Sequence, residues 1–503
     1  MRALLSVYRK DGIVEFASAL AELGYELVAS GGTSATLDAA GIAHITVEEV
    51  TGFAEMLDGR VKTLHPRLHA GILADRSKPE HLDDLKRLDI APIDVVVCNL
   101  YPFADRPSIE TIDVGGPSMI RAAAKNYQAV TVVVENSDFS RVLEWLRKTG
   151  EVPTPLRREL AARAFDHLSR YDRLIADWLD VKDVNEPLPE RLHLDLDRAK
   201  LLRYGENPHQ RGALYFLRGA SSWLEGMTLH SGMELSYLNL FDADAAWRLV
   251  HELSIDSAAA VIVKHANPCG AAISAVSVAD AYQRAFESDP ISAFGGIVAI
   301  NRIVDGQLAD EIAANPKADV IIAPGYGDGV LEQLAAARKS TRVISASPPE
   351  IPSRSLRSLG GAYLLQEYDK FVVSESEWKL VTRVGVTDDQ MRDLRVAWTV
   401  CARTSSNAIV LARDEMAVGI GAGQQNRLDS ARIAISKAGK RTKGAVGASD
   451  AFFPFPDGLL ALAEAGVSAV ISPGGSIRDS EVIEAANQAG VAMVFTGERH
   501  FKH

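Results

Sequence analysis

Residues 261–271 read VIVKHANPCGA, and this stretch indicates the fold more directly than any other part of the chain. Its apolar run ends at Lys264 and His265, and Asn267 and Gly270 are expected to stop it. The pattern predicts a buried strand that carries an ammonium group and an imidazole to its carboxyl end, where open α/β sheets bind ligands. A neighbouring lysine favours the neutral imidazole, which can accept a proton from an attacking amine. The alternative is a solvated pair at a strand end.

Strand and helix signals alternate through the first half of the chain, which predicts a doubly wound parallel sheet. Two of its segments, 93–100 and 129–134, are rich in β-branched residues without polar alternation, as expected when both faces of a sheet are covered. The extended segments are RALLSV (2–7), YELVAS (25–30), HITVEEV (44–50), IDVVVCNL (93–100) and AVTVVV (129–134). Helices are expected between them, the first ending near Gly24 and the next near Gly41.

Two breaks in composition divide the chain. Residues 180–200 are charged and aperiodic, and residues 345–357 contain three prolines. We therefore expect one domain over residues 1–190 and a second over 196–503, with two similar α/β lobes that divide near 350–380. The strands expected in the second domain are AAAVIV (258–263), GGIVAI (295–300), DVIIAP (319–324), NAIVLA (407–412), MAVGIG (416–421), VSAVIS (467–472) and VAMVFT (491–496).

Composition limits the class of protein. The 503 residues carry a formal net charge of −12 without a basic tract, which argues against a nucleic-acid partner. Three widely spaced cysteines argue for a reducing compartment without a disulfide framework. We expect no membrane span and no signal peptide, because apolar runs are short and the chain becomes charged within nine residues. A cytoplasmic protein is the expectation.

Polar side chains follow the predicted strands of the first domain. The turn at 30–33, SGGT, lets backbone N–H groups approach a phosphate at a helix start. The segment 60–66, RVKTLHP, gathers cations and a hydroxyl, and CNLYPF at 98–103 places an amide and a phenol at a strand end. DVGG at 113–116 precedes a helix. Together these residues suit a phosphorylated, amide-bearing ligand, although a helix cap and a solvated loop are the plainer interpretations.

These motifs resemble a known family. SGGT, GRVKTLHP, CNLYPF and DVGGPSMIRAAAKN, in this order, are similar to the cyclohydrolase domain of the bifunctional purine biosynthesis enzymes. KHANPCG, DPISAFGG, IIAPGY, GIGAGQQNR, SDAFFPF and the terminal RHFKH resemble their transformylase domain. The resemblance spans nearly the whole chain. It implies a methylglyoxal-synthase-like first domain and two cytidine-deaminase-like lobes in the second.

The resemblance also implies two reactions. The family transfers a formyl group from 10-formyltetrahydrofolate to 5-aminoimidazole-4-carboxamide ribonucleotide (AICAR), and then closes formyl-AICAR to IMP with loss of water. For formyl transfer it implies His265 as the proton acceptor, Lys264 as its assistant, and Asn407 as the donor that steadies the formyl oxygen. The positions that match its nucleotide and folate contacts are Arg203, Tyr204, Gly295, Asp319, Arg427, Leu428, Phe452, Asp457, Ser476, Ile477 and Arg499. A core position is the equally weighted alternative for Phe452.

For ring closure the resemblance implies Lys125 as proton donor or acceptor, with Lys62, Tyr101 and Asp113 around the closing ring. The phosphate and carboxamide contacts are expected from Lys10, Ser30, Gly31, Gly32, Thr33, Arg60, Thr63, Cys98 and Asn99, the last two largely through their backbone. The chain departs from the family at Tyr8 and Arg9, where relatives carry a small hydroxyl and an acid.

The resemblance further implies a homodimer with transformylase sites shared between subunits. Some members hold a potassium ion near the chain end, for which Thr404, Asp450 and His503 are the candidates, although Ala408 replaces an oxygen-bearing residue. No other metal is required.

Three other functions share parts of this pattern. A zinc deaminase needs H-x-E and P-C-x-x-C, but Ala266-Asn267 follows His265 and no second thiol follows Cys269. A dinucleotide oxidoreductase is disfavoured because the glycines at 419–423 do not complete G-x-G-x-x-G. A regulatory nucleotide-binding module stays open for the first domain on fold alone.

Overall fold

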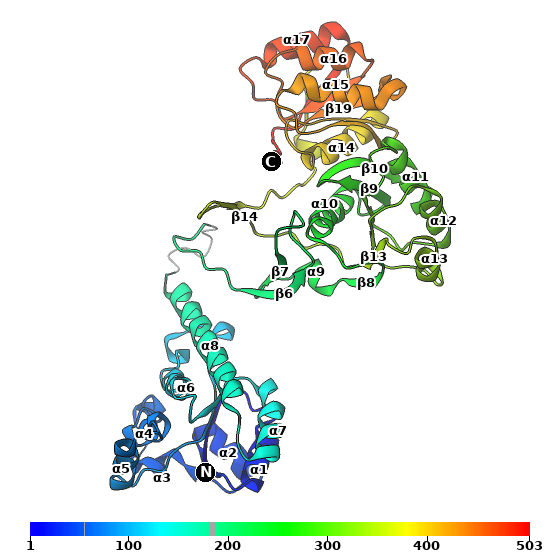
Figure 1. Ribbon diagram of the computed structural model, residues 1–503. Helices are drawn as coiled ribbons and strands as arrows, with labels where there is room; N and C mark the ends of the chain where they lie inside the picture. Colours follow the sequence, from blue (N-terminus) through cyan, green and yellow to red (C-terminus); the bar gives the residue numbers. More distant parts are fainter. Residues whose placement is uncertain (55, 181–187) are drawn as a thin grey trace. The chain divides into compact units, whose positions relative to one another are not determined.

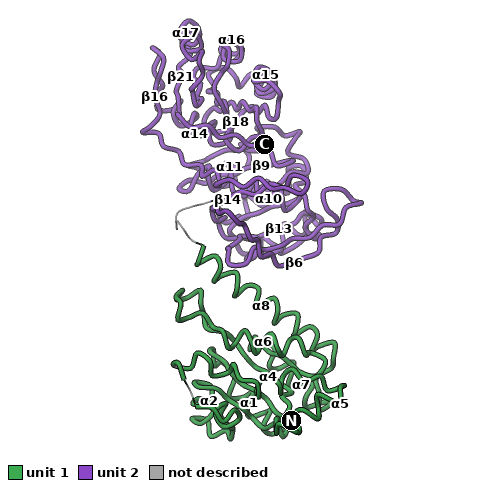
Figure 2. The backbone as a smooth tube through the Cα atoms, turned by 90° about the vertical axis from the view of Figure 1, so that its left-hand side faces the viewer, with its two compact units in different colours: residues 1–186 green, residues 187–503 purple. Residues whose placement is uncertain are grey.

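The computed structural model describes residues 1–54, 56–180 and 188–503, and it separates into two compact units, Met1–Glu186 and Pro187–His503 (Figure 2). The domain boundary predicted within residues 180–200 falls partly on residues 181–187, which lie outside the described part of the chain. The first unit has one hydrophobic core, and the second has a core on each side of its sheet.

The first unit contains a five-stranded parallel sheet in the order β3-β2-β1-β4-β5. Its strands are β1 (Arg2–Val7), β2 (Glu26–Ala29), β3 (Ile45–Thr46), β4 (Val95–Asn99) and β5 (Thr131–Val133). The doubly wound parallel sheet predicted from the alternating signals is therefore confirmed. The strand order reverses between β1 and β4, and the carboxyl ends of these strands flank the crevice where such sheets bind ligands.

The segment 44–50, which was predicted to be extended throughout, becomes a helix after Thr46. The Thr46 hydroxyl accepts a hydrogen bond from the Glu49 backbone at 3.2 Å, and the Glu49 carboxylate accepts one from the Thr46 backbone at 2.6 Å. This capping box starts a helix despite the β-branched residues that follow. The helices of the unit are α1 (Ile13–Glu22), α2 (Gly31–Ala39), α3 (Val47–Thr51), α4 (Pro66–Leu73), α5 (Pro79–Arg87), α6 (Gly115–Lys125), α7 (Phe139–Thr149) and α8 (Thr154–Asp180).

The second unit contains a twelve-stranded sheet in which one arrangement occurs twice. The first copy has the strand order β10-β9-β11-β12-β13 and the second has β18-β17-β19-β20-β21, joined where β10 pairs with β18. The two similar lobes expected from the sequence are thus halves of one continuous sheet, with β8 and β16 at its outer edges. The strands are β8 (Thr228–Ser231), β9 (Ala258–Lys264), β10 (Asn267–Ser274), β11 (Ile297–Ile300), β12 (Val320–Ala323), β13 (Arg342–Ser345), β16 (Lys379–Leu380), β17 (Ile409–Arg413), β18 (Met416–Gly421), β19 (Val446–Ser449), β20 (Ala469–Ser472) and β21 (Ala492–Phe495).

The helices follow the same repeat. In each copy a long helix precedes an antiparallel hairpin, a second helix follows it, and two more alternate with the parallel strands (Figure 1). The helices of the unit are α9 (Trp223–Gly226), α10 (Tyr237–Leu253), α11 (Val278–Ser288), α12 (Gly306–Ala314), α13 (Val330–Ala337), α14 (Asp388–Ala402), α15 (Arg427–Ala438), α16 (Asp457–Glu464) and α17 (Asp479–Ala489). Two separate hairpins complete it, β6 (Leu196–Leu202) with β7 (Gly212–Leu217) and β14 (Arg354–Leu359) with β15 (Ala362–Glu367).

The predicted strand before Lys264 is present as β9, but the expectation that Asn267 and Gly270 stop the run was wrong. The chain turns within two residues and returns as β10, antiparallel to β9. A register shift between Pro268 and Gly270 accommodates the proline, which lacks an N–H for the ladder. Gly270 is required for packing, because a side chain there would collide with the Ala285 carbonyl of α11.

The two turns of the repeat share an unusual backbone. His265 and Ala266 both have φ of 55°, and their counterparts Asp414 and Glu415 have φ of 54° and 56°. Two-residue hairpin turns need positive φ at both positions, which residues other than glycine adopt only at a cost of about 1–2 kcal/mol each. Among the described helices none is long and apolar enough to cross a membrane.

Candidate active sites

The loops after β1 and β2 are joined by hydroxyl groups at the carboxyl edge of the first sheet. Ser30 Oγ donates to Ser6 Oγ at 2.7 Å. The buried Thr33 hydroxyl accepts from the Val7 backbone N–H at 2.9 Å and donates to the Val7 carbonyl at 3.1 Å. These bonds hold the start of α2, with its backbone N–H groups, against the end of β1. A helix start of this kind attracts anions.

Two ammonium groups face the glycine pair at this helix start. Lys62 Nζ lies 3.6 Å from the position that a Cβ on Gly31 would take, and Lys10 Nζ lies 3.7 Å from that of Gly32. Lys10 also donates to Thr33 Oγ1 at 3.2 Å, and Lys62 pairs with Glu48 at 2.8 Å. Burial lowers the pKa of Lys10. The structure thus brings Lys10, Lys62 and the SGGT turn together, as a phosphate site requires.

Asn99 ties the loop after β1 to the end of β4. Its Oδ1 accepts from the backbone N–H groups of Tyr8 at 2.6 Å and Arg9 at 3.0 Å, and its Nδ2 donates to the Arg9 carbonyl at 3.1 Å. Both lone pairs of the amide oxygen are used within the loop. Tyr101, two residues further on, is half exposed and packs against the ring of Tyr8.

Asp113 lies at the start of α6. Its Oδ1 accepts from the Gly116 backbone at 2.9 Å, and its own N–H donates to the Tyr171 hydroxyl at 2.8 Å. Burial raises the pKa of the Asp113 carboxyl despite the N–H groups of Gly115 and Gly116. Side chains on these glycines would collide with the Thr63 hydroxyl and with the Asp113 carboxylate, respectively. Gly115 and Gly116 therefore allow α6 to begin against the Thr63 hydroxyl and the Asp113 carboxylate.

Cys98 is buried next to this helix start. Its thiol contacts the Gly116 carbonyl at 3.9 Å, and burial followed by the charge of Asp113 raises the thiol pKa. The thiol is therefore protonated, consistent with a contact through the backbone at this position.

Two further predicted residues of this site, Lys125 and Arg60, have their described contacts elsewhere. Lys125 is the last residue of α6, so about 15 Å of helix separates it from Gly115 and the Asp113 end. Its neighbours line an apolar groove that includes His69, Arg121 and Phe165. Arg60 is exposed and pairs with Glu110. No hydrogen bond or ion pair among the described residues joins either of them to Gly31 or Gly32.

In the second unit, the turn after β9 presents His265 to solvent. Lys264 Nζ donates to the Phe294 carbonyl at 2.9 Å, which ties it to the loop containing Gly295. Gly295 donates its N–H to the Lys317 carbonyl at 2.8 Å, and the Lys317 ammonium lies 3.3 Å from Asp319. The structure therefore connects four of the predicted positions, Lys264, His265, Gly295 and Asp319, through one set of loops.

The loop with Asn407 is bonded directly to the His265 turn. Asn267 Oδ1 accepts from the Ser405 backbone at 2.8 Å, and Asn267 Nδ2 donates to the His265 carbonyl at 3.1 Å. Asn407 Nδ2 donates to the Gln424 carbonyl at 2.8 Å. An amide nitrogen carries two N–H groups, so this bond fixes the side chain and leaves one donor for a ligand.

Arg427 is committed to a buried ion pair. Its Nη2 lies 2.8 Å from Asp450 Oδ1 and its Nε donates to Ser449 Oγ at 2.7 Å. The sequence left Phe452 undecided between core and site. The structure places Phe453 in the core at 1% exposure and leaves Phe452 half-buried, which favours the site. Asp457 accepts from the Gly458 N–H at 2.7 Å at the start of α16.

The remaining predicted positions lie on the surface of the second unit. The guanidinium of Arg203 stacks on Tyr204 at 4.8 Å, and that of Arg499 stacks on Phe501 at 4.3 Å. Leu428 and Ser476 are partly exposed, and Ile477 is fully exposed. No hydrogen bond or ring contact among the described residues joins them to the His265 turn.

Three residues next to the turn were missed from the sequence. Asp242 accepts both turn N–H groups, Lys502 donates to the Ala266 carbonyl, and Arg403 contacts Lys502 through its carbonyl. Burial, then the charge of Arg403, lowers the pKa of Lys502 to about 8. The closing motif RHFKH includes Lys502, but nothing in the sequence indicates that it lies next to residues near 242 or 265 in the fold.

Comparison with known proteins agrees with this architecture. The family model described as "AICARFT/IMPCHase bienzyme" matches residues 123–437, and the model described as "MGS-like domain" matches residues 12–131. Relatives named bifunctional purine biosynthesis protein PurH are 46% identical in Ruminiclostridium cellulolyticum, 46% in Acetivibrio thermocellus and 45% in Bacillus cereus. Each comparison covers 100% of this chain and 99% of the relative.

Proposed function

The chain belongs to the AICARFT/IMPCHase bienzyme family, and from that premise we propose how its residues divide the two reactions. It is a bifunctional enzyme of purine biosynthesis that formylates AICAR and closes the product to IMP. The second unit carries out formyl transfer at the His265 turn, and the first carries out ring closure at the turn that contains Gly31 and Gly32. The observation that carries the assignment is the 2.8 Å bond from Ser405 to Asn267, which joins the His265 turn to the Asn407 loop.

In formyl transfer, the 5-amino nitrogen of AICAR attacks the formyl carbon of the folate co-substrate. His265 accepts the amine proton, and the free N–H of Asn407 donates to the formyl oxygen as it gains negative charge. When the bond from carbon to folate nitrogen breaks, that nitrogen takes a proton and the formyl group stays on AICAR. The bond from Lys264 to the Phe294 carbonyl holds the ammonium beside the reacting groups.

In ring closure, the carboxamide nitrogen attacks the formamide carbon, and the former formyl oxygen leaves as water. Lys10 and the start of α2 hold the substrate phosphate, as the position of Lys10 next to Gly32 and Thr33 supports. Tyr101 and Asp113 stand on the strand-end loops next to that site. Lys62, whose ammonium faces Gly31, is the proposed cation that stabilises the departing oxygen, and Lys125 is the proposed proton donor or acceptor.

The family's formyl transfer uses a folate co-substrate, for which we assign 10-formyltetrahydrofolate. Leu428, Ser476 and Ile477 are the proposed contacts for it. The fully exposed side chain of Ile477 supports this assignment, because an apolar side chain without a protein contact is available to a planar ring.

The buried carboxylate of Asp450 fits a potassium ion. Its Oδ2 has no hydrogen-bond partner among the described residues, and Thr404, also fully buried, uses its hydroxyl hydrogen on the Val400 carbonyl. Asp450 and Thr404 would supply oxygen ligands, and the ion would supply fixed positive charge in the core of the unit. His503 is exposed and contacts Arg357 through its carbonyl, so it fits less well.

A homodimer is supported by the hairpin β14–β15. Leu359, Tyr363 and Leu364 are 49%, 65% and 58% exposed on it, and an isolated two-stranded hairpin is marginal in water. A second subunit that covers this hairpin would account for both features. Cytoplasmic location is supported by the three buried free cysteines, Cys98, Cys269 and Cys401.

The two-site assignment is tested by replacing His265 with alanine. Formyl transfer from 10-formyltetrahydrofolate should fall by about 100-fold or more, the range lost with a general base. Ring closure of supplied formyl-AICAR should continue at the unchanged rate. Tetrahydrofolate and IMP are followed separately, and loss of both products together would contradict the assignment.

A further inference from the structure

The His265 turn is held from both sides by side chains that come from distant parts of the chain. On one side, Asp242 of α10 accepts from the His265 N–H at 3.1 Å and from the Ala266 N–H at 2.8 Å. These bonds compensate two backbone positions with positive φ, which are otherwise unfavourable for residues other than glycine. The turn therefore depends on contacts outside the hairpin to keep its shape.

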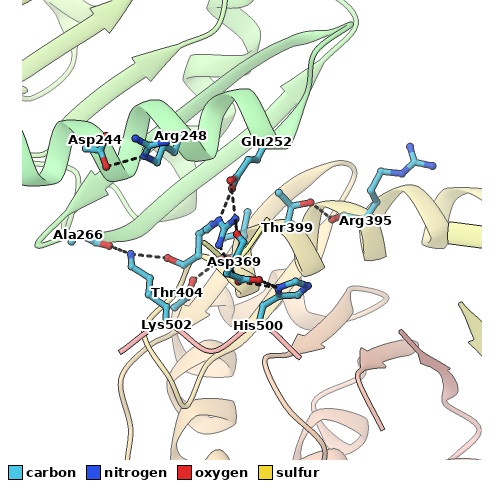
Figure 3. A network of polar contacts seen from close by, with 12 residues as sticks. Asp244, Arg248, Glu252, Ala266, Asp369, Arg395, Thr399, Thr404, His500 and Lys502 are labelled. Carbon is cyan, nitrogen blue, oxygen red and sulfur yellow. Dashed lines mark hydrogen bonds and ion pairs between the residues drawn. The ribbon is translucent and has the colours of Figure 1, made fainter. Parts of the chain in front are cut away.

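On the other side, Lys502 bridges the turn to the second lobe. Its ammonium donates to the Ala266 carbonyl and, at 3.0 Å, to the Arg403 carbonyl (Figure 3). The backbone of Lys502 pairs with Ser405, and its carbonyl accepts from the Ser406 N–H at 2.9 Å. One residue near the chain end thus contacts both the turn that carries His265 and the loop that leads to Asn407.

Arg403, which receives the Lys502 bond, is itself fixed. Its guanidinium lies 2.6 Å and 2.8 Å from the two carboxylate oxygens of Glu252 in α10, and it also contacts Asp369 at 3.3 Å. Buried His500 lies 2.8 Å from Asp369 (Figure 3). The bridge from Lys502 therefore ends on a residue whose side chain is held by two carboxylates.

We propose that Lys502 is a positioning residue for formyl transfer, which fixes the separation of His265 and Asn407 by bonding the turn of one lobe to the loop of the other. Asp242 complements it from the opposite side of the turn. The inference rests on the proposed function, in which these two residues act on the same formyl group. A displacement of about 1 Å between reacting groups is sufficient to slow a reaction about 100-fold.

The test uses the full-length protein with Lys502→Met. We expect kcat for formyl transfer to fall about 10- to 100-fold while KM for AICAR changes less than about threefold, because positioning affects the reacting groups more than binding. Ring closure by the same polypeptide should stay unchanged, which reports that the first unit is folded, and the nearly unchanged KM for AICAR reports that the second unit is folded. Lys339→Met, at an exposed lysine of the same unit, is the matched control.

Chemical rescue separates positioning from a general structural role. Lys502→Cys can be alkylated with bromoethylamine to restore an ammonium of nearly the same length, and the three native cysteines are buried. Restored kcat supports the proposal. Unchanged kcat in Lys502→Met, a rise in KM alone, or failure of the alkylated protein to regain kcat would overturn it. His265→Ala is assayed in parallel: if it keeps formyl transfer, the site assignment fails, whereas if only the Lys502 variants keep it, this inference alone fails.

Discussion

The ring of Tyr8 lies edge-on to the ring of Tyr101, with centroids 5.3 Å apart and planes at 63°. Both rings are about half exposed, at 51% and 49%. The resemblance predicts a small hydroxyl residue at position 8, so this contact comes with the departure of Tyr8 from that pattern. The Tyr8 ring thus limits the positions open to Tyr101, a residue proposed to act in ring closure.

Replacing Tyr8 with serine should therefore slow ring closure. An aromatic pair of this kind contributes about 0.5–1.5 kcal/mol, which corresponds to roughly 2- to 12-fold in kcat/KM for formyl-AICAR. Tyr8→Phe keeps the ring and should match the native rate. Equal rates for the serine and phenylalanine variants would show that the ring contact does not position Tyr101.

The internal repeat offers a matched pair of aspartates. Asp242 and Asp393 are both the sixth residue of their helices, and each accepts backbone N–H groups of the following hairpin turn. Removing either carboxylate leaves these donors without a partner, at a cost of about 1–3 kcal/mol. Asp242→Ala and Asp393→Ala should lower the melting temperature similarly. Only Asp242→Ala should reduce formyl transfer, and a similar reduction by Asp393→Ala would contradict a specific role of the His265 turn.

The rate of ring closure should fall in acid, and this fall should begin at a higher pH than the titration of an ordinary aspartate would give. Burial raises the pKa of Asp113, so at a given pH below neutrality more of this carboxyl is protonated than in a free side chain. If the anion is the active form, kcat/KM for formyl-AICAR falls as the pH drops through this raised value. The profile is measured from about pH 4 to 8. Asp113→Asn should remove this limb, and a limb retained in that variant would assign it to another group.

The hairpin β14–β15 should mediate association between subunits. Replacing Tyr363 and Leu364 with lysine removes apolar surface and adds charge. The dissociation constant of the dimer should therefore rise, and the variant should become monomeric at protein concentrations at which the native protein is a dimer. Analytical ultracentrifugation measures this change. Formyl transfer should fall with dissociation because its sites are proposed to be shared, whereas ring closure should persist. A dimer of native stability would exclude this hairpin from the interface.

Much of the fold was predictable because buried parallel strands leave a clear local signal. The runs that became β1, β4, β9 and β20 are largely apolar, the last three are rich in β-branched residues, and each formed a strand near its predicted position. The errors arose where a short-range polar contact or a tight turn overrides hydrophobicity. At Thr46 a capping box started a helix, and at His265 a two-residue turn continued the sheet with Asn267.

The sequence alone determined the order of strands and helices and the family, because apolar periodicity and motif order are local properties of the chain. It also predicted His265, Lys264 and the SGGT turn as site residues. Only the tertiary structure decided which groups meet: Lys502 with Ala266 across 236 residues, Asp242 with the turn, and Lys125 away from Asp113. The physical reason is that hydrogen bonds depend on atoms being within about 3 Å of each other, and folding brings distant residues to that range without any sequence spacing to record it.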